Sequence, residues 1–316
     1  MIKDGIWQPK KRRKPRIHQM RERRSCEGEL IQIDGSPHAW FEDRRPKCNL
    51  LAFIDDATSK VKQLYFSETE TTLAYFQSLG SYLNTYGKPL ALYADKNSVF
   101  RINTNKGGAS STKDSQGLTQ FGRAMKQLDI ELIAAHSAQA KGRVERLFET
   151  LQDRLVKELR LRKISSFEQA SQYLPEFISE FNQKFSVKPR NSTNAHRPLL
   201  AKDNLERILV FHYTRILSKN LTCQFENKVY QIETKRPAYT MRHAPVLVIK
   251  DLKERVTIEY KGRKLDYTIL EKQPKARIVD TKQLNKVVDR VKADKIETEK
   301  AQWKPSTDHP WRHFTI

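Results

Sequence analysis

The chain has few cysteines and no long apolar run, and each shortage excludes a class of protein. Its three cysteines, Cys26, Cys48 and Cys223, are odd in number and lack C-x-x-C spacing, which argues against a disulfide framework and a cysteine zinc site. No apolar run approaches the ~20 residues that span a bilayer, and no apolar segment follows the basic N-terminus as in a signal peptide. We therefore expect a soluble protein of a reducing cytoplasm, without a membrane partner.

Acidic residues are also scarce relative to basic ones. The 316 residues include 59 Lys and Arg against 37 Asp and Glu, a net charge of +22. This excess is typical of nucleic-acid binders, although ribosomal and membrane-surface proteins share it. Residues 1–27 hold ten of the basic residues, and the run KKRRKPR includes Lys11, Arg12 and Arg13. We expect a basic N-terminal arm that follows phosphates; a merely solvated tail is the alternative.

The order of the predicted elements in residues 28–190 indicates an α/β fold. Three short strands come first, and helices and strands then alternate in the way that gives parallel pairing. The predicted elements are strands 30–34, 49–55 and 61–66, helix 71–86, strand 89–94, helix 119–128, strand 129–135, and helices 141–162 and 166–185. We expect a mixed sheet flanked by helices, with an aperiodic, flexible loop at 96–117 and Ser165 or Ser166 capping the last helix.

The remainder of the chain predicts a smaller second unit. Residues 191–216 are interpreted as a linker that begins with NSTNAHRPL. Five short, alternating runs follow Leu221 and predict a small antiparallel β-barrel over residues 217–271. Residues 272–316 are Lys-rich and are expected to be a mostly irregular basic tail with one helix around TKQLNKVVDRVK.

Three carboxylates stand out in this basic chain. We expect Asp34 to close the first strand, Asp95 to close the fourth, and Glu145 to lie beside Val144 at the edge of the apolar face of helix 141–162. Adjacent strand ends and a helix packed on them could bring the three to shared divalent cations. Two Mg²⁺ ions about 3.5–4 Å apart suit phosphodiester chemistry, since Mg²⁺ prefers oxygen ligands, and Mn²⁺ should substitute.

Each carboxylate also has a plain structural interpretation. Asp34 with Gly35 is compatible with a turn pair, Asp95 with the start of a loop, and Glu145 with an exposed helical acid. Only their joint placement in this order of elements favours a metal site.

The flanks of these carboxylates resemble a known family. GELIQIDGSPHAWF, NLLAFIDDATSKVKQLYFSETETTLAYFQSL, LYADKNSVF and HSAQAKGRVERLFETLQDRLVKEL are similar to the integrase core of insertion-sequence transposases with an Asp-Asp-Glu triad, most closely the ISNCY type. The resemblance covers roughly residues 28–200 and implies a ribonuclease H-like fold. It also implies that Asp34, Asp95 and Glu145 are the catalytic, metal-binding triad.

What the resemblance implies about function is metal-dependent phosphodiester hydrolysis and strand transfer of a mobile element. It implies DNA partners, both transposon ends and target, a homo-oligomer on that DNA, and a bacterial, nucleoid-associated protein. Two departures are visible: fifty positions separate Asp95 and Glu145, and only a basic arm precedes the core where the family carries helix-turn-helix domains. An inactive DNA-binding remnant of a truncated transposase is therefore the alternative, and a ribonuclease H-type nuclease acting on hybrids is a third.

Basic residues surround the third carboxylate. Lys141, Arg143 and Arg146 flank Glu145 at the helix start, where a DNA phosphate would approach, and an ordinary solvated helix face is equally compatible.

Other residues near the carboxylates favour structural roles. His136 is interpreted as loop packing rather than a ligand. Trp40, close to His38, could stack on a base or lie in the core, and Asp55 and Asp56 suit a hairpin turn better than a metal site.

Overall fold

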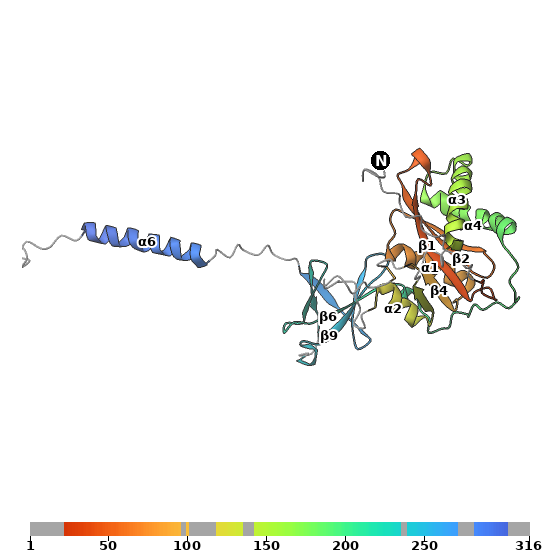
Figure 1. Cartoon of the computed structure of the whole chain (residues 1–316). Coiled ribbons are helices and arrows are strands. Elements are labelled where there is room, and N and C mark those ends of the chain that lie inside the picture. The colour runs from red at the N-terminus through yellow and green to blue at the C-terminus, as the bar shows by residue number, and fades with distance from the viewer. Residues whose placement is uncertain are drawn as a thin grey trace, which may run out of the picture.

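The computed structural model describes residues 22–95, 99–100, 118–134, 142–234, 239–270 and 281–302. In these ranges a five-stranded sheet carries helices on both faces, and a unit of short strands follows it in the chain (Figure 1). The loop predicted at 96–117 lies outside the described residues except for 99–100, as do the arm residues Lys11, Arg12 and Arg13.

The central sheet has the order β3-β2-β1-β4-β5. Its strands are β1 (Leu30–His38), β2 (Cys48–Asp55), β3 (Val61–Ser67), β4 (Ala91–Ala94) and β5 (Glu131–Ala134). β1 and β3 pair antiparallel with β2, whereas β1–β4 and β4–β5 are parallel. The predicted α/β fold is confirmed: the sheet is mixed, antiparallel first and parallel after, in the ribonuclease H-like arrangement.

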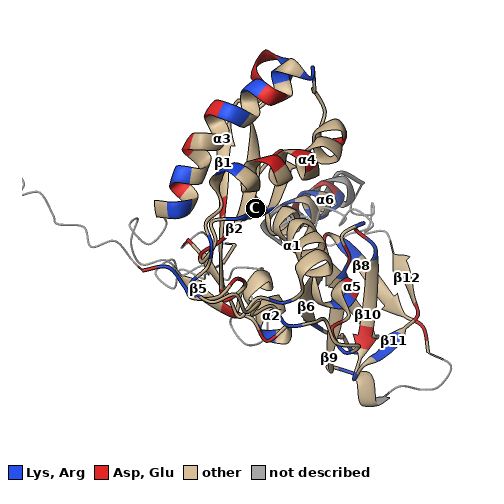
Figure 2. Ribbon diagram, turned by 90° about the vertical axis from the view of Figure 1, so that its right-hand side faces the viewer, with Lys and Arg blue, Asp and Glu red and all other residues tan. Residues whose placement is uncertain are grey.

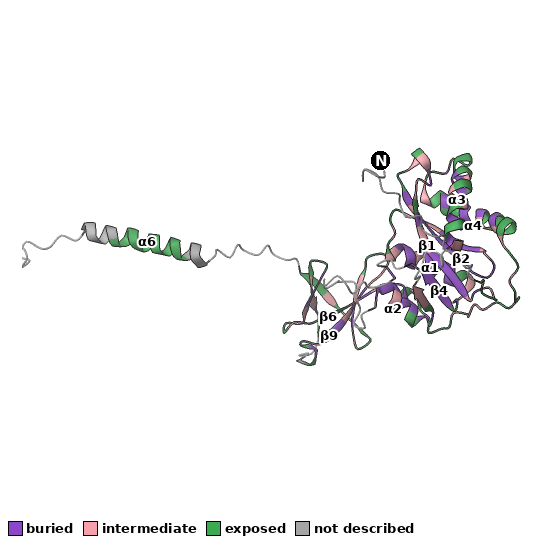
Figure 3. Ribbon diagram, viewed as in Figure 1, coloured by how far each residue is buried: buried purple, intermediate pink, exposed green. Residues whose placement is uncertain are grey.

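Two pairs of helices cover the two faces of this sheet. One face carries α1 (Thr72–Tyr86) and α2 (Gln120–Gln127), and the other carries α3 (Gly142–Leu161) and α4 (Phe167–Phe185). Each interface is an apolar layer of buried side chains, so the sheet is enclosed over most of its strands (Figure 3). A short 3₁₀ helix, η1 (Glu42–Arg44), lies between β1 and β2.

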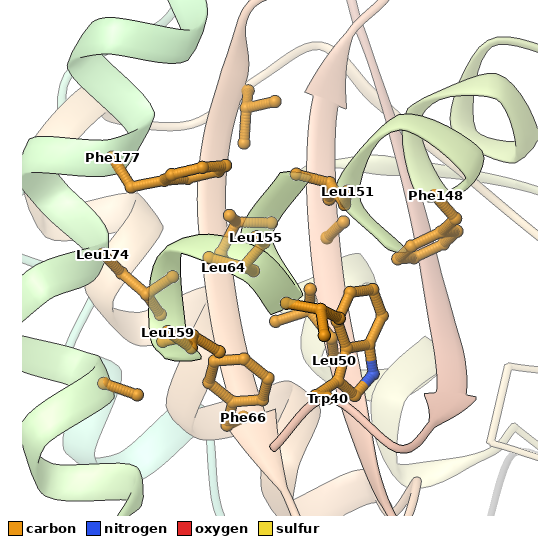
Figure 4. Close-up of a cluster of buried hydrophobic side chains, with 14 of the residues drawn as sticks. Trp40, Leu50, Leu64, Phe66, Phe148, Leu151, Leu155, Leu159, Leu174 and Phe177 are labelled. Atoms are coloured by element: carbon orange, nitrogen blue, oxygen red, sulfur yellow. The ribbon is translucent and has the colours of Figure 1, made fainter. Parts of the chain in front are cut away.

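The layer beneath α3 and α4 follows from helical spacing. Val144, Leu147, Leu151 and Leu155 recur every three or four residues, so they form one stripe and are all buried. In Figure 4, Leu151 and Leu155 lie over Leu64 and Leu50 of the strands, with Trp40 beside them. Burying such side chains contributes about 1.5–3 kcal/mol each relative to exposure, which fixes α3 on this face.

Local signals set the ends of α1. The Thr71 hydroxyl accepts a hydrogen bond from the Ala74 amide at 3.2 Å, an N-cap that satisfies one of the free amides of the first turn. Gly87 ends the helix at a φ of +85°, and a Cβ there would lie 2.5 Å from the carbonyl oxygen of Arg197. Only glycine fits this position without displacing the backbone.

The second unit, which we call the β module, contains seven strands rather than five. They are β6 (Phe211–Ile216), β7 (Thr222–Phe225), β8 (Lys228–Ile232), β9 (Pro245–Lys250), β10 (Val256–Tyr260), β11 (Arg263–Leu265) and β12 (Tyr267–Leu270). They form two antiparallel sheets, ordered β11-β10-β9-β6 and β12-β8-β7, around one apolar cluster. β6 lies in the segment interpreted as a linker, so the sheet begins six residues earlier than expected.

Three short or separate helices complete the described chain: α5 (Leu205–Ile208), η3 (Tyr239–Met241) and α6 (Thr281–Gln302). The helix expected in the C-terminal tail is present as α6, and it continues ten residues beyond the predicted end. None of the described helices combines the length and the hydropathy needed to cross a membrane.

Residues 191–197, which we call the strap, run along the unit built on the five-stranded sheet rather than away from it. The amides of Asn191 and Ala195 donate to the carbonyls of Ser25 and Glu27, and Arg197 and Lys88 exchange two backbone hydrogen bonds. The β module is then held to α2, because the Gln120 side chain both donates to and accepts from the backbone of His212, at 2.7 and 2.9 Å. The connection between the two units is therefore hydrogen-bonded on both sides.

Candidate active site on the face covered by α3

Asp34 lies in the middle of β1, not at its end as the sequence suggested. β1 continues through Gly35 to His38 because residues 34–38 stay paired with β2, so the turn interpretation of Asp34 and Gly35 is wrong. Asp34 pairs with Ala52, a member of the core beneath α3 and α4, and directly opposed residues share a face. The half-buried Asp34 side chain is therefore on the α3 face.

Asp34 and Asp95 come two residues after a paired position of two parallel strands. The register pairs Gln32 of β1 with Tyr93 of β4, so each aspartate lies two residues beyond this pair. Neighbouring strands are about 4.8 Å apart and side chains alternate with a period of two, so continuation of this register by one residue past Ala94 would bring both aspartates to the same face. Asp95 directly follows the last residue of β4 and is half-buried, as expected for a strand end.

Glu145 approaches this pair from α3. Gln152, two helical turns further on and thus on the same side of the helix, donates to the Ser36 hydroxyl at 3.2 Å, two residues beyond Asp34. Glu145 lies about 10.5 Å before Gln152 along α3, and Asp34 about 6.6 Å before Ser36 along β1. The two carboxylates are therefore at similar levels along neighbouring elements, with Val144 buried and Glu145 exposed.

The three carboxylates line one face without closing into a cage. Throughout the described ranges, no three His, Cys, Asp or Glu side chains are grouped closely enough to hold one metal ion. Asp34 lies in β1 and Asp95 directly follows β4, whereas Glu145 lies at the exposed start of α3.

Two residues missed by the sequence reasoning, Glu70 and Tyr75, lie within reach of the aspartates' charges. The buried Tyr75 hydroxyl of α1 donates to the Glu70 carboxylate at 2.8 Å. Burial raises the pKa of Tyr75 well above its usual value, and the charges of Glu70, Asp34 and Asp95 raise it further. These carboxylates thus build a negative potential around one buried hydroxyl. Glu70 directly precedes the N-cap of α1, which was the available signal in the sequence.

This negative potential and the oxygen ligands fit a divalent cation. Asp34 and Asp95 offer carboxylate oxygens, which Mg²⁺ prefers, and a cation would offset the repulsion between their charges. Gly35 leaves room for Glu70, because a Cβ at that position would lie 3.1 Å from the Glu70 carboxyl carbon.

The basic residues expected to contact DNA are placed differently from one another. Arg143 donates to the buried Asp56 carboxylate at 2.6 Å, whereas Arg146 is exposed and donates to the Gly142 carbonyl at 2.9 Å (Figure 2 shows the charged residues of α3). Lys141, like the arm residues Lys11–Arg13, lies outside the described residues, as does His136.

The remaining candidates have structural roles. Trp40 is fully buried, and its indole nitrogen donates to the Ser36 carbonyl at 3.0 Å, so it belongs to the core and does not stack on a base. Asp55 and Asp56 do begin the turn, yet both are fully buried: Asp55 accepts from the Gly28 and Thr58 amides, each at 2.8 Å. They hold the chain preceding β1 against the turn.

Comparison with known proteins supports the resemblance. No protein-family model matches the chain. It is 41% identical over 296 residues to y4bF of Sinorhizobium fredii, by its name a candidate transposase, covering 92% of this chain and 64% of that protein. It is 38% identical over 249 residues to the transposase for insertion sequence IS1202 of Streptococcus pneumoniae, covering 78% of this chain and 51% of that protein. The chain thus spans somewhat less than two thirds of the length of y4bF and about half of the length of the IS1202 transposase.

Solved structures give weaker similarities. The integrase catalytic core domain of HTLV-2 in complex with magnesium has 18% identity and a TM-score of 0.38, covering 52% of this chain and 94% of that one. A chain of the simian T-cell lymphotropic virus intasome has 14% identity and a TM-score of 0.41, covering 83% of this chain and 86% of that one. By sequence, the chain is thus similar to a candidate transposase over 92% of its length and to the transposase of an insertion sequence over 78%.

Proposed function

We propose that the chain is the catalytic part of a DNA transposase that hydrolyses a phosphodiester to free a 3′-hydroxyl and joins that hydroxyl to target DNA. The observation that supports the proposal is the parallel pairing of β1 with β4, because Asp34 and Asp95 each follow the paired residues Gln32 and Tyr93 by two positions, and α3, the helix of Glu145, covers the Asp34 face of β1. The names of the two sequence relatives support the same reaction class. The ISNCY type stays a prediction.

Asp34 and Asp95 would hold the metal, with Glu145 as the third ligand. The chemistry that bound Mg²⁺ supplies is activation of the attacking oxygen and stabilisation of the leaving oxygen, for which two ions are proposed and Mn²⁺ is a substitute. Tyr75 and Glu70 are hydrogen-bonded to each other, and the charges of both aspartates act on the Tyr75 hydroxyl. The sheet would carry two of the ligands, and α3 the third.

DNA would be held by phosphate contacts rather than by one pocket. Arg146 is exposed and directly follows Glu145. Lys141 and the arm residues Lys11, Arg12 and Arg13 are proposed to extend that basic surface. Joining two transposon ends also requires more than one copy, so a homo-oligomer on DNA is part of the proposal. No observation in the structure favours the inactive remnant over this assignment.

The test is Mg²⁺-dependent nicking of supercoiled plasmid and strand transfer with duplexes carrying the ends of the insertion sequence. Glu145→Gln should lower both rates by more than about a hundredfold, since even groups behind metal ligands cost 10–100-fold when changed. Glu149→Gln, an exposed acid one turn further along α3, is the matched control and should retain wild-type rates. Undiminished activity of Glu145→Gln would refute the triad.

A further inference from the structure

The Asp56 carboxylate joins three separate parts of the core. It is fully buried. Its Oδ1 accepts hydrogen bonds from the side-chain Nε2 of Gln32 at 2.8 Å and from the Arg143 guanidinium at 2.6 Å. Its Oδ2 accepts from the backbone amide of Arg24 at 2.9 Å. One carboxylate therefore bonds β1, the start of α3 and the chain that leads into β1.

Two of these partners stand next to the proposed metal ligands. Gln32 precedes Asp34 by two residues, so both side chains are on the same face of β1. Arg143 precedes Glu145 by two residues and lies in the first turn of α3. Asp56 thus connects the strand that carries one ligand to the helical turn that carries another.

The Arg143–Asp56 ion pair is more deeply buried than the ion pair at the other end of α3. The side chains of Arg143 and Asp56 are 14% and 0% exposed, whereas those of Arg160 and Glu42, the pair at the other end of the helix, are 58% and 34% exposed. A buried carboxylate needs its charge paired and its lone pairs hydrogen-bonded, which Gln32, Arg143 and the Arg24 amide provide. The first turn of a helix has unsatisfied amides and frays readily, so this contact restrains the turn that bears Glu145.

We propose that Asp56 is a positioning residue that, through Gln32 and Arg143, sets the distance between Asp34 and Glu145 for metal binding. The role rests on the proposed function of Glu145 as a metal ligand. It also assigns Arg143 to the core rather than to DNA, in contrast to the exposed Arg146.

The experiment measures Mn²⁺ binding to the full chain, from the electron paramagnetic resonance signal of the free ion, and the Mg²⁺ concentration that gives half-maximal plasmid nicking. Asp56→Asn and Arg143→Gln should each weaken Mn²⁺ binding and raise the Mg²⁺ requirement about tenfold, the usual effect of changing a group behind a metal ligand. Arg160→Gln removes an exposed ion pair of the same helix and should leave both quantities at wild-type values.

Two additions keep the test decisive. The double variant Asp56→Asn/Arg143→Gln leaves no unpaired buried charge, so it should fold if a single variant does not, as circular dichroism will show. It should lose no more Mn²⁺ affinity than the worse single variant, because both changes break one connection. DNA affinity, measured by fluorescence anisotropy, should not weaken in Asp56→Asn.

Wild-type Mn²⁺ affinity in the folded variants would overturn the role of Asp56. Weaker DNA binding in Arg143→Gln, with Mn²⁺ binding unchanged, would instead make Arg143 a DNA contact. A wild-type chain that binds Mn²⁺ without nicking DNA would contradict the proposed function alone, and the Mn²⁺ affinities of the variants would still decide the role of Asp56.

Discussion

His212, at the start of β6, is a buried histidine whose protonation opposes folding. Burial, and then the charge of Arg123, lower its pKa to about 4, although the hydrogen bond of its Nε2 with the Arg207 carbonyl opposes this shift. In the unfolded chain the pKa is about 6.5. Between pH 6.5 and about pH 4, His212 is therefore protonated in the unfolded chain and neutral in the folded one.

The free energy of unfolding should fall as the pH falls through that window. The contribution of neutral His212 to the free energy of unfolding is complete above pH 6.5. About 2 kcal/mol of this contribution should be lost at pH 5. Urea unfolding at pH 7 and pH 5 measures the loss. His212→Gln, which cannot take up the proton, should show a smaller difference between the two pH values; an unchanged difference would contradict this account.

At the scale of single elements, α4 begins with a complete capping box. The Ser166 hydroxyl accepts from the Gln169 amide at 3.2 Å, and the Gln169 side chain accepts from the Ser166 amide at 3.3 Å. The structure thus selects Ser166 over Ser165, which the sequence left open. Ser166→Ala should lower the free energy of unfolding by about 1 kcal/mol in urea titrations. Ser165→Ala is the control, and an equal loss there would show that the cap is misassigned.

The elements with a strong local period could be predicted from the sequence, and those defined by distant partners could not. Helix α3 is visible in the spacing of Val144, Leu147 and Leu151. The predicted end of β1 at Asp34 was wrong. Gly35 and Pro37 disfavour strands by local propensity, but pairing with β2 holds them extended. β6 was missed for the same reason: its pairing with β9, thirty residues later, is not a local signal.

The candidate site shows the same division at the level of side chains. Asp34, Asp95 and Glu145 were singled out by their places in the predicted elements and by flanks that resemble a family, and their role as a triad stays a prediction. The partnership of Arg143 with Asp56 joins positions 87 residues apart, so the charge pattern alone could not indicate it and left a DNA contact or a solvated helix face open. Glu70 was passed over because its closeness to Asp34 depends on the packing of α1 against β1.

On the scale of the whole molecule, the net charge of +22 should make DNA binding strongly salt-dependent. Each phosphate contact adds about 0.9 to the slope of log affinity against log salt. Replacing Lys11, Arg12 and Arg13 together by Gln should therefore lower the slope by up to about 2.7, as fluorescence anisotropy on a random duplex between 50 and 200 mM NaCl will show. A slope equal to that of the wild-type chain would mean that the arm does not touch phosphates.

The strap changes where the unit built on the five-stranded sheet can be cut to make a smaller protein. A fragment that stops at residue 190 would leave the backbone of residues 25–27 and Lys88 without the strap, and it would strip the buried Lys88 ammonium of the Asp203 carboxylate, which lies 2.5 Å away. An unpaired buried charge is costly. Fragments for crystallisation or inhibitor screening should therefore begin before Arg24 and end after Asp203, well beyond the last helix of the sheet.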